Sequence, residues 1–106
     1  MGYFVETRWS GSEENPTPER MREILAELDV PDDEHPDTWL GDEDGWTLSA
    51  YQSGALVLEN LETGEGPFHR TAVPRDDILR LWLELANGRI DDVRTGPWNP
   101  GVPSGG

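Results

Sequence analysis

Carboxylates are the side chains with which this sequence could do chemistry, and they gather between residues 29 and 44. That stretch, DVPDDEHPDTWLGDED, holds eight Asp and Glu residues and no Lys or Arg. Paired carboxylates can act as the acid and base of a glycosidase, and clustered ones can bind hard cations such as calcium. The glycosidase signal is not specific here, because 22 acidic residues among 106 place a carboxylate pair almost anywhere.

The spacing of the acidic stretch does not fit a calcium loop. A loop of the EF-hand type beginning at Asp32 would place Asp37 where glycine is required, and one beginning at Asp42 would place Trp46 at a ligand position. At most an incidental weak site remains, so the sequence predicts neither a bound metal nor a cofactor. The glycines of residues 52–54 and 62–66 match no phosphate-binding loop.

Nucleophilic catalysis has no support in the sequence. The chain has no cysteine, and its histidines are His35 and His69. Neither stands in an HExxH motif, and neither forms a triad-like pattern with a candidate nucleophile such as Ser49 or Ser53. We expect the protein to have no enzymatic activity of its own.

The charge balance favours a basic protein partner. The 22 acidic residues face 8 basic ones, all Arg, for a formal net charge of −14 at pH 7. Such a field repels DNA, RNA and anionic lipid and accelerates encounter with a basic surface, so we expect no direct binding to nucleic acid or membrane. The first residues lack a basic region followed by an apolar run, and no segment approaches about 18 apolar residues, so a cytoplasmic location is expected.

We predict that the acidic stretch forms the main contact surface for that partner. The predicted contact residues are Asp32, Asp33, Glu34, Asp37, Asp42, Glu43 and Asp44, with Trp39 as an aromatic anchor. Two alternatives stand beside this interpretation: the carboxylates could imitate the phosphates of DNA, or they could belong to a solvated loop. Trp39 could equally be buried against the first helix.

The elements that would position these residues follow from apolar spacing and from turn residues. Helices are predicted at about 18–29, where Thr17 is the N-cap, and at about 75–87, where Pro74 precedes the helix and Gly88 ends it. Strands are predicted at 3–9, 38–40, 46–51, 55–61 and 68–73, with one more possible at 90–94. Residues 1–98 would form a single domain, and residues 99–106 an irregular tail rich in Gly and Pro.

This order of elements predicts the α+β class, with an antiparallel sheet of four to five strands and two helices packed on one face. The predicted core comprises Val5, Trp46, Leu48, Leu56, Leu58 and Phe68. The facing of the strand at 55–61 stays open, because Leu56 and Val57 are both apolar.

From Trp46 onward, the chain contains the hairpin WTLSAYQSGALVLENL and the segment VPRDDILRLWLELANG, followed by a tryptophan near the end. With Val73, Pro74, Gly88 and Trp98 at the corresponding places, this half of the sequence resembles the Imm1-type immunity proteins that are encoded beside bacterial polymorphic toxins. It implies a protein that binds a cognate toxin domain, such as a nuclease or deaminase, and blocks its basic active-site groove.

The sequence therefore leads to an immunity protein as the main hypothesis of function. One alternative is an acidic DNA mimic that inhibits a restriction, CRISPR or other nucleic-acid enzyme. Another is an acidic adaptor protein within a larger assembly. Carboxylates gathered in one loop favour the immunity hypothesis, because a mimic needs them spaced along an extended surface.

Overall fold

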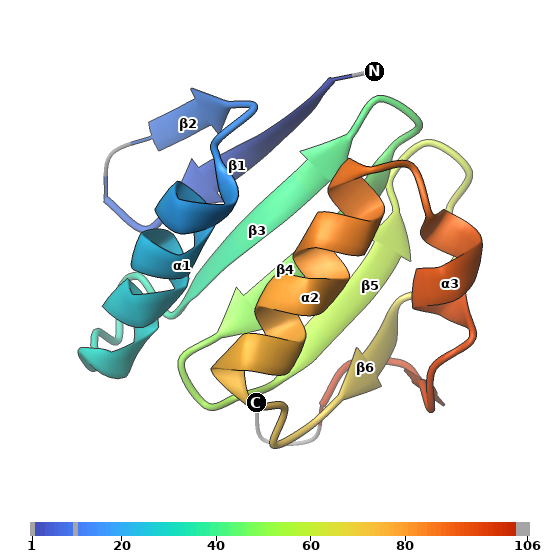
Figure 1. The fold of residues 1–106 in the computed structure, drawn as a ribbon. Helices are drawn as coiled ribbons and strands as arrows, with labels where there is room; N and C mark the ends of the chain where they lie inside the picture. Colours follow the sequence, from blue (N-terminus) through green and yellow to red (C-terminus); the bar gives the residue numbers. More distant parts are fainter. Residues whose placement is uncertain (1, 10, 104–106) are drawn as a thin grey trace.

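A seven-stranded antiparallel sheet organises the molecule. The computed structural model describes residues 2–9 and 11–103, and its strands lie in the order β2-β1-β3-β4-β5-β6-β7 (Figure 1). The strands are β1 (Tyr3–Thr7), β2 (Gly11–Glu14), β3 (Asp37–Asp42), β4 (Trp46–Tyr51), β5 (Leu56–Asn60), β6 (Phe68–Arg70) and β7 (Asn99–Pro100). The helices are α1 (Pro18–Ala26), followed by the 3-10 turn η1 (Glu27–Asp29), α2 (Arg75–Ala86) and α3 (Ile90–Arg94).

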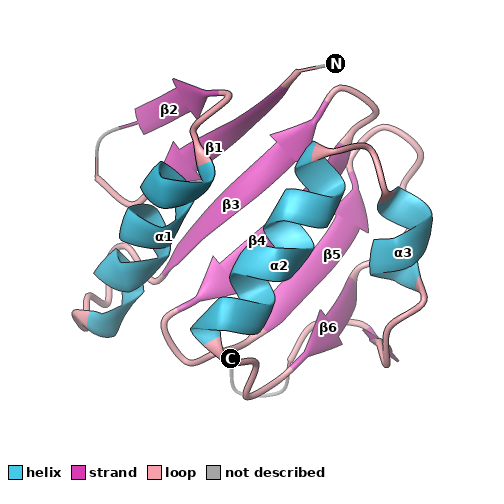
Figure 2. Ribbon diagram, viewed as in Figure 1, coloured by secondary structure: helices cyan, strands magenta, loops and turns pink. Residues whose placement is uncertain are grey.

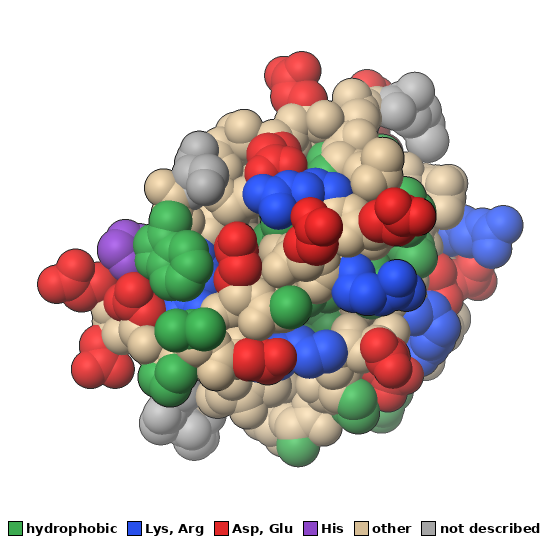
Figure 3. Space-filling model, turned by 60° about the vertical axis from the view of Figure 1, so that its left-hand side comes forward, with side chains coloured by type: hydrophobic (Ala, Val, Ile, Leu, Met, Phe, Trp, Pro, Cys, Tyr) green, Lys and Arg blue, Asp and Glu red, His purple; other side chains and the backbone are tan. Residues whose placement is uncertain are grey.

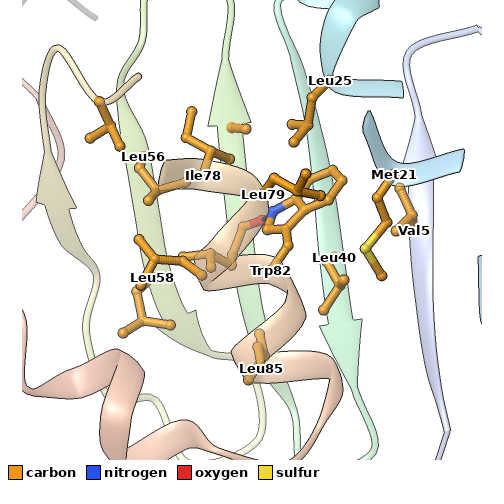
Figure 4. Close-up of a cluster of buried hydrophobic side chains, with 14 of the residues drawn as sticks. Val5, Met21, Leu25, Leu40, Leu56, Leu58, Ile78, Leu79, Trp82 and Leu85 are labelled. Atoms are coloured by element: carbon orange, nitrogen blue, oxygen red, sulfur yellow. Dashed lines mark hydrogen bonds between the residues drawn. The ribbon is translucent and has the colours of Figure 1, made fainter. Parts of the chain in front are cut away.

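The core lies between one face of the sheet and the helices, which Figure 2 shows in front of the strands. Val5, Leu40, Leu48 and Leu58 are paired across neighbouring strands, so their side chains point to the same face, and all four are fully buried. Trp82 of α2 lies among them (Figure 4), and its indole N–H donates to the Leu48 carbonyl oxygen at 3.0 Å. This bond ties α2 to the middle of the sheet.

The first helix forms for the reasons that the sequence indicates. The Thr17 hydroxyl oxygen accepts the N–H of Arg20 at 3.1 Å, which caps the N-terminus. Met21, Ile24 and Leu25 follow at helical spacing and are buried. The chain leaves the helical conformation at Val30, which is extended because Pro31 follows it.

The predicted α+β class with an antiparallel sheet is confirmed, and the predicted number of strands is wrong. The sheet has seven strands instead of four to five. β2 lies outside the predicted strands. Its sequence GSEE contains no apolar residue, yet it pairs with β1 along the sheet edge. β7 adds two residues of the segment expected to be an irregular tail, of which residues 104–106 lie outside the described part of the chain.

The predicted number of helices is also wrong, because residues 90–94 form α3 instead of a short strand. Ile90 and Val93 lie three residues apart on one side of this turn, and Val93 is fully buried against the core. Asp91 and Asp92 in its first turn and Arg94 in its last turn suit the helix dipole. A segment of five residues is too short for its periodicity to separate helix from strand.

The predicted core is largely confirmed. Val5, Leu48, Leu56 and Leu58 are fully buried, Trp46 is 6% exposed, and Phe68 packs against the cluster while remaining partly exposed. Leu56 faces the helices. Val57 points to the opposite face and is also buried. Val102 and Pro103 lie beside it and beside Tyr51.

Candidate functional site

The structure distributes the eight predicted contact residues over three places around β3. Residues 32–34 lie in the loop before the strand, Asp37 and Trp39 lie on it, and residues 42–44 lie at its far end. A strand of six residues is roughly 17 Å long, so the two acidic ends are not adjacent. The eight residues therefore do not form one compact loop, although their closeness in the sequence suggests one.

The loop before β3 is held by a buried arginine. Arg8 follows β1 and is 4% exposed. Its guanidinium donates to the carbonyl oxygens of Glu27, of Val30 at 2.8 Å and of His35 at 2.6 Å. One cation therefore fixes both ends of the acidic loop from inside, while the carboxylates of Asp33 and Glu34 stay on its surface.

Gln52 and Asp32 complete this arrangement. The Gln52 side-chain oxygen accepts the Asp32 N–H at 2.9 Å and a guanidinium N–H of Arg8 at 3.3 Å. One Asp32 carboxylate oxygen accepts the N–H groups of Glu34 at 2.9 Å and His35 at 3.2 Å. Desolvation raises the pKa of Asp32, but these bonds and one from the Trp9 indole outweigh it and lower that pKa below the usual value.

Trp9 is the aromatic side chain of this region that the sequence did not reveal. It is 49% exposed, its indole N–H donates to Asp32 at 3.2 Å, and the Arg8 guanidinium carbon lies 4.7 Å from its ring centroid. Val30, 57% exposed, belongs to the same loop that Arg8 binds. The strand predicted at residues 3–9 would include Trp9, but β1 ends at Thr7.

The second part of the site is the face of the sheet opposite the helices. The side chains that point to it, by the register of β1 and β3–β6, are Phe4, Glu6, Asp37, Trp39, Thr47, Ser49, Tyr51, Val57, Glu59 and His69. No Arg occupies any of these described positions. We call this surface the open face.

Trp39 lies on the open face and therefore points away from α1. Its ring meets that of Phe4 edge to face, with centroids 5.2 Å apart and an interplanar angle of 76°. Gly41 makes room for both rings, because a Cβ atom there would lie 2.8 Å from Phe4 Cζ and 3.1 Å from Trp39 Cζ3. Both rings are partly buried, so the pair is fixed and still reachable.

Asp37 and Tyr51 are directly paired across β3 and β4 on the same face. Burial raises the pKa of Asp37. Burial also raises the pKa of Tyr51, and the charges of Asp37 and Glu59 add to that rise. The open face thus combines partial desolvation with negative charge.

The acidic turn after β3 serves first as a structural turn. One Asp42 carboxylate oxygen accepts the N–H of Asp44 at 3.0 Å and that of Trp46 at 2.9 Å. Burial raises the pKa of Asp42, and the neighbouring charges of Asp44 and Glu43 raise it further. Glu43 accepts the Gly2 N–H at 2.5 Å, which joins the turn to the start of β1.

The helix side carries several of the arginines. Figure 3 shows a face on which Arg side chains lie among carboxylates. A shallow groove of about 480 Å³ between α1 and α2 is lined in part by Arg22, Arg80 and Arg89. Arg80 lies near Asp77 and Glu84, at N–O distances of 3.8 and 3.5 Å. The helix side therefore has mixed charge, while the charged side chains at the described positions of the open face are the carboxylates of Glu6, Asp37 and Glu59, with one histidine, His69.

Within residues 2–9 and 11–103, no three His, Asp or Glu side chains are placed to hold a metal ion together. Across the same residues, no helix has the length and apolar character needed to cross a membrane.

Comparison with protein-family models, with curated proteins and with solved structures finds no match for this chain.

Proposed function

We propose that this protein is an immunity protein that binds a cognate bacterial toxin and blocks the basic groove of its active site. The observation that carries the proposal is the acidic loop at residues 30–36, which Arg8 and Gln52 hold in one conformation beside the exposed ring of Trp9. A fixed loop loses little conformational entropy on binding, and an exposed indole is a frequent binding hot spot.

The arrangement suits capture and blocking of a basic groove. The net charge of −14 would accelerate encounter with a cationic surface, and the loop carboxylates would occupy positions that an anionic substrate takes in the groove. The desolvated aromatic contacts would then slow dissociation. Neither step requires the protein itself to carry a catalytic group.

The experiment uses the domain encoded by the gene adjacent to this one, which we expect to be a toxin. We expect the purified protein to bind that domain and to abolish its activity at a ratio near one to one. A triple variant, Asp32→Asn, Asp33→Asn and Glu34→Gln, should associate more slowly. The proposal is overturned if the domain is bound no better than an unrelated basic protein of similar size.

A DNA mimic remains the second candidate, and one observation now favours it. The carboxylates are not confined to one loop, because they lie at both ends of β3 and, as Glu6, Asp37 and Glu59, across the open face. Negative charges spaced along a surface are what a mimic of the phosphate backbone needs. A mimic should inhibit several unrelated DNA-binding enzymes, whereas an immunity protein should inhibit one toxin.

A further inference from the structure

We propose that Trp39 and Phe4, with the carboxylates of Glu6 and Asp37, form a receptor for an arginine side chain of the protein partner. This inference rests on the proposed function, since it names the chemical group by which the partner is recognised. It concerns the open face, which is separate from the acidic loop that carries the proposal above.

The carboxylates lie at positions from which they can reach a cation on the Trp39 ring. Glu6 is directly opposite Trp39 in the β1–β3 pairing, and side chains so paired have Cβ atoms about 5 Å apart. Asp37 precedes Trp39 by two residues on the same face of β3, at about 7 Å. One oxygen of Glu6 accepts the Ser12 hydroxyl at 2.5 Å, which holds the carboxylate in place.

The ring pair offers a fixed aromatic surface. In an edge-to-face pair each ring keeps at least one face that its partner does not cover, and Trp39 and Phe4 are only partly buried. Gly41 allows this geometry, because any larger residue would push both rings away from the strand. A guanidinium can stack on an indole and at the same time bond a neighbouring carboxylate through its planar fork of donors.

Charge complementarity decides the occupant. The described positions of the open face carry Glu6, Asp37 and Glu59 and no Arg, so a cationic side chain meets attraction across this surface and a phosphate meets repulsion. A purely apolar partner surface would leave those partly desolvated carboxylates without a counter-charge. Arginine fits better than lysine because it combines stacking with directed hydrogen bonds.

The experiment titrates the folded protein with an oligo-arginine peptide and with an oligo-lysine peptide of equal length, by calorimetry at about 0.1 M salt. We expect tighter binding of the arginine peptide, and about a tenfold loss of its affinity in Trp39→Leu. The double variant Glu6→Gln and Asp37→Asn should lose affinity as well. The matched control, Glu19→Gln with Asp91→Asn, removes the same charge at exposed positions on the helix side and should lose much less.

Two outcomes overturn the inference: unchanged affinity in Trp39→Leu, or an equal loss in the two charge-matched double variants, which would mean that only net charge attracts the peptide. If Trp39→Leu fails to fold, an NMR titration of the parent with the arginine peptide decides. A peptide bound at the open face should shift the indole N–H signal of Trp39 more than those of the other tryptophans, and a larger shift elsewhere contradicts the inference. Toxin binding that survives Trp39→Leu unchanged contradicts this receptor and leaves the proposed function standing. Selective arginine binding without toxin neutralisation supports this receptor and contradicts the proposed function.

Discussion

Arg8 is the residue on which the acidic loop most depends. Its guanidinium donates hydrogen bonds to the carbonyl oxygens of Glu27, Val30 and His35, and the residue is almost completely buried. Arg8→Met should lower the free energy of unfolding by about 3 kcal/mol, because several buried acceptors lose a charged donor. Urea unfolding measures this loss. Arg22→Met, at an exposed position, is the control and should change stability by less than about 0.5 kcal/mol.

If Arg8→Met and Arg22→Met unfold at the same urea concentration, the buried guanidinium does not stabilise the loop. Arg8→Lys separates charge from geometry. A single ammonium cannot supply the planar set of donors, so this variant should lie closer to Arg8→Met than to the parent.

Asp37 should make the protein less stable as the pH rises. Burial raises the pKa of Asp37 in the folded state above that of the unfolded chain, so the folded state binds the proton more tightly. Stability from this group is fully present below the unfolded pKa and is lost as the pH rises through the folded pKa. Asp37→Asn removes that loss, so at about pH 7 the variant should equal or exceed the parent in stability.

Urea unfolding across about pH 4 to 8 tests this linkage. The advantage of Asp37→Asn over the parent should shrink as the pH falls. Asp33→Asn removes one charge from the surface of the loop and serves as the charge-matched control. Parallel curves for the two variants would show that Asp37 contributes only to the net charge.

At the scale of elements, the contact between α2 and β4 should be the most sensitive. Trp82 is fully buried and donates to the Leu48 carbonyl oxygen. Trp82→Phe leaves that acceptor without this donor and leaves a small cavity, so it should cost about 2–3 kcal/mol of stability. Trp9→Phe, at a ring that is 49% exposed, is the matched control. Thermal unfolding compares them, and a smaller effect for Trp82 than for Trp9 would contradict the close packing of Trp82 against β4.

The elements also show which parts of the fold could be predicted from the sequence. Apolar alternation predicted β1, and turn residues on either side predicted β4 and β5. Start and stop residues with apolar side chains between them predicted α1 and α2. The residues of all five elements enter the core. β2 has no apolar residue, and it forms a strand because its backbone pairs with that of β1. β3 is flanked by carboxylates, so the sequence indicated only 38–40 of its six residues.

Less of the candidate site could be predicted from the sequence, because the site depends on contacts between distant segments. The sequence indicated that the acidic stretch and Trp39 could bind a partner, which remains a prediction. It could not show that Arg8 reaches Val30 and His35, or that Phe4 pairs with Trp39, since local spacing carries no information on such contacts.

For the whole molecule, charge should control the rate of binding more than its lifetime. Association with the proposed toxin partner should slow as ionic strength rises from about 0.05 to 0.5 M, because the Debye length falls from about 14 Å to about 4 Å. Dissociation should change less, because in this proposal it depends on desolvated contacts such as that of Trp39. Stopped-flow mixing measures both rates. An association rate that does not depend on salt would mean that the net charge of −14 has no part in recognition.

The bonds of Arg8 also have a consequence for how the molecule opens. They join the end of β1 to carbonyl groups 19, 22 and 27 residues further along the chain. The acidic loop cannot detach by itself, since it must first release the residue that follows β1. Amide hydrogens of the loop and of the end of β1 should therefore exchange with deuterium in one cooperative opening, and a protease should cut this proline-rich acidic loop only in that opened state.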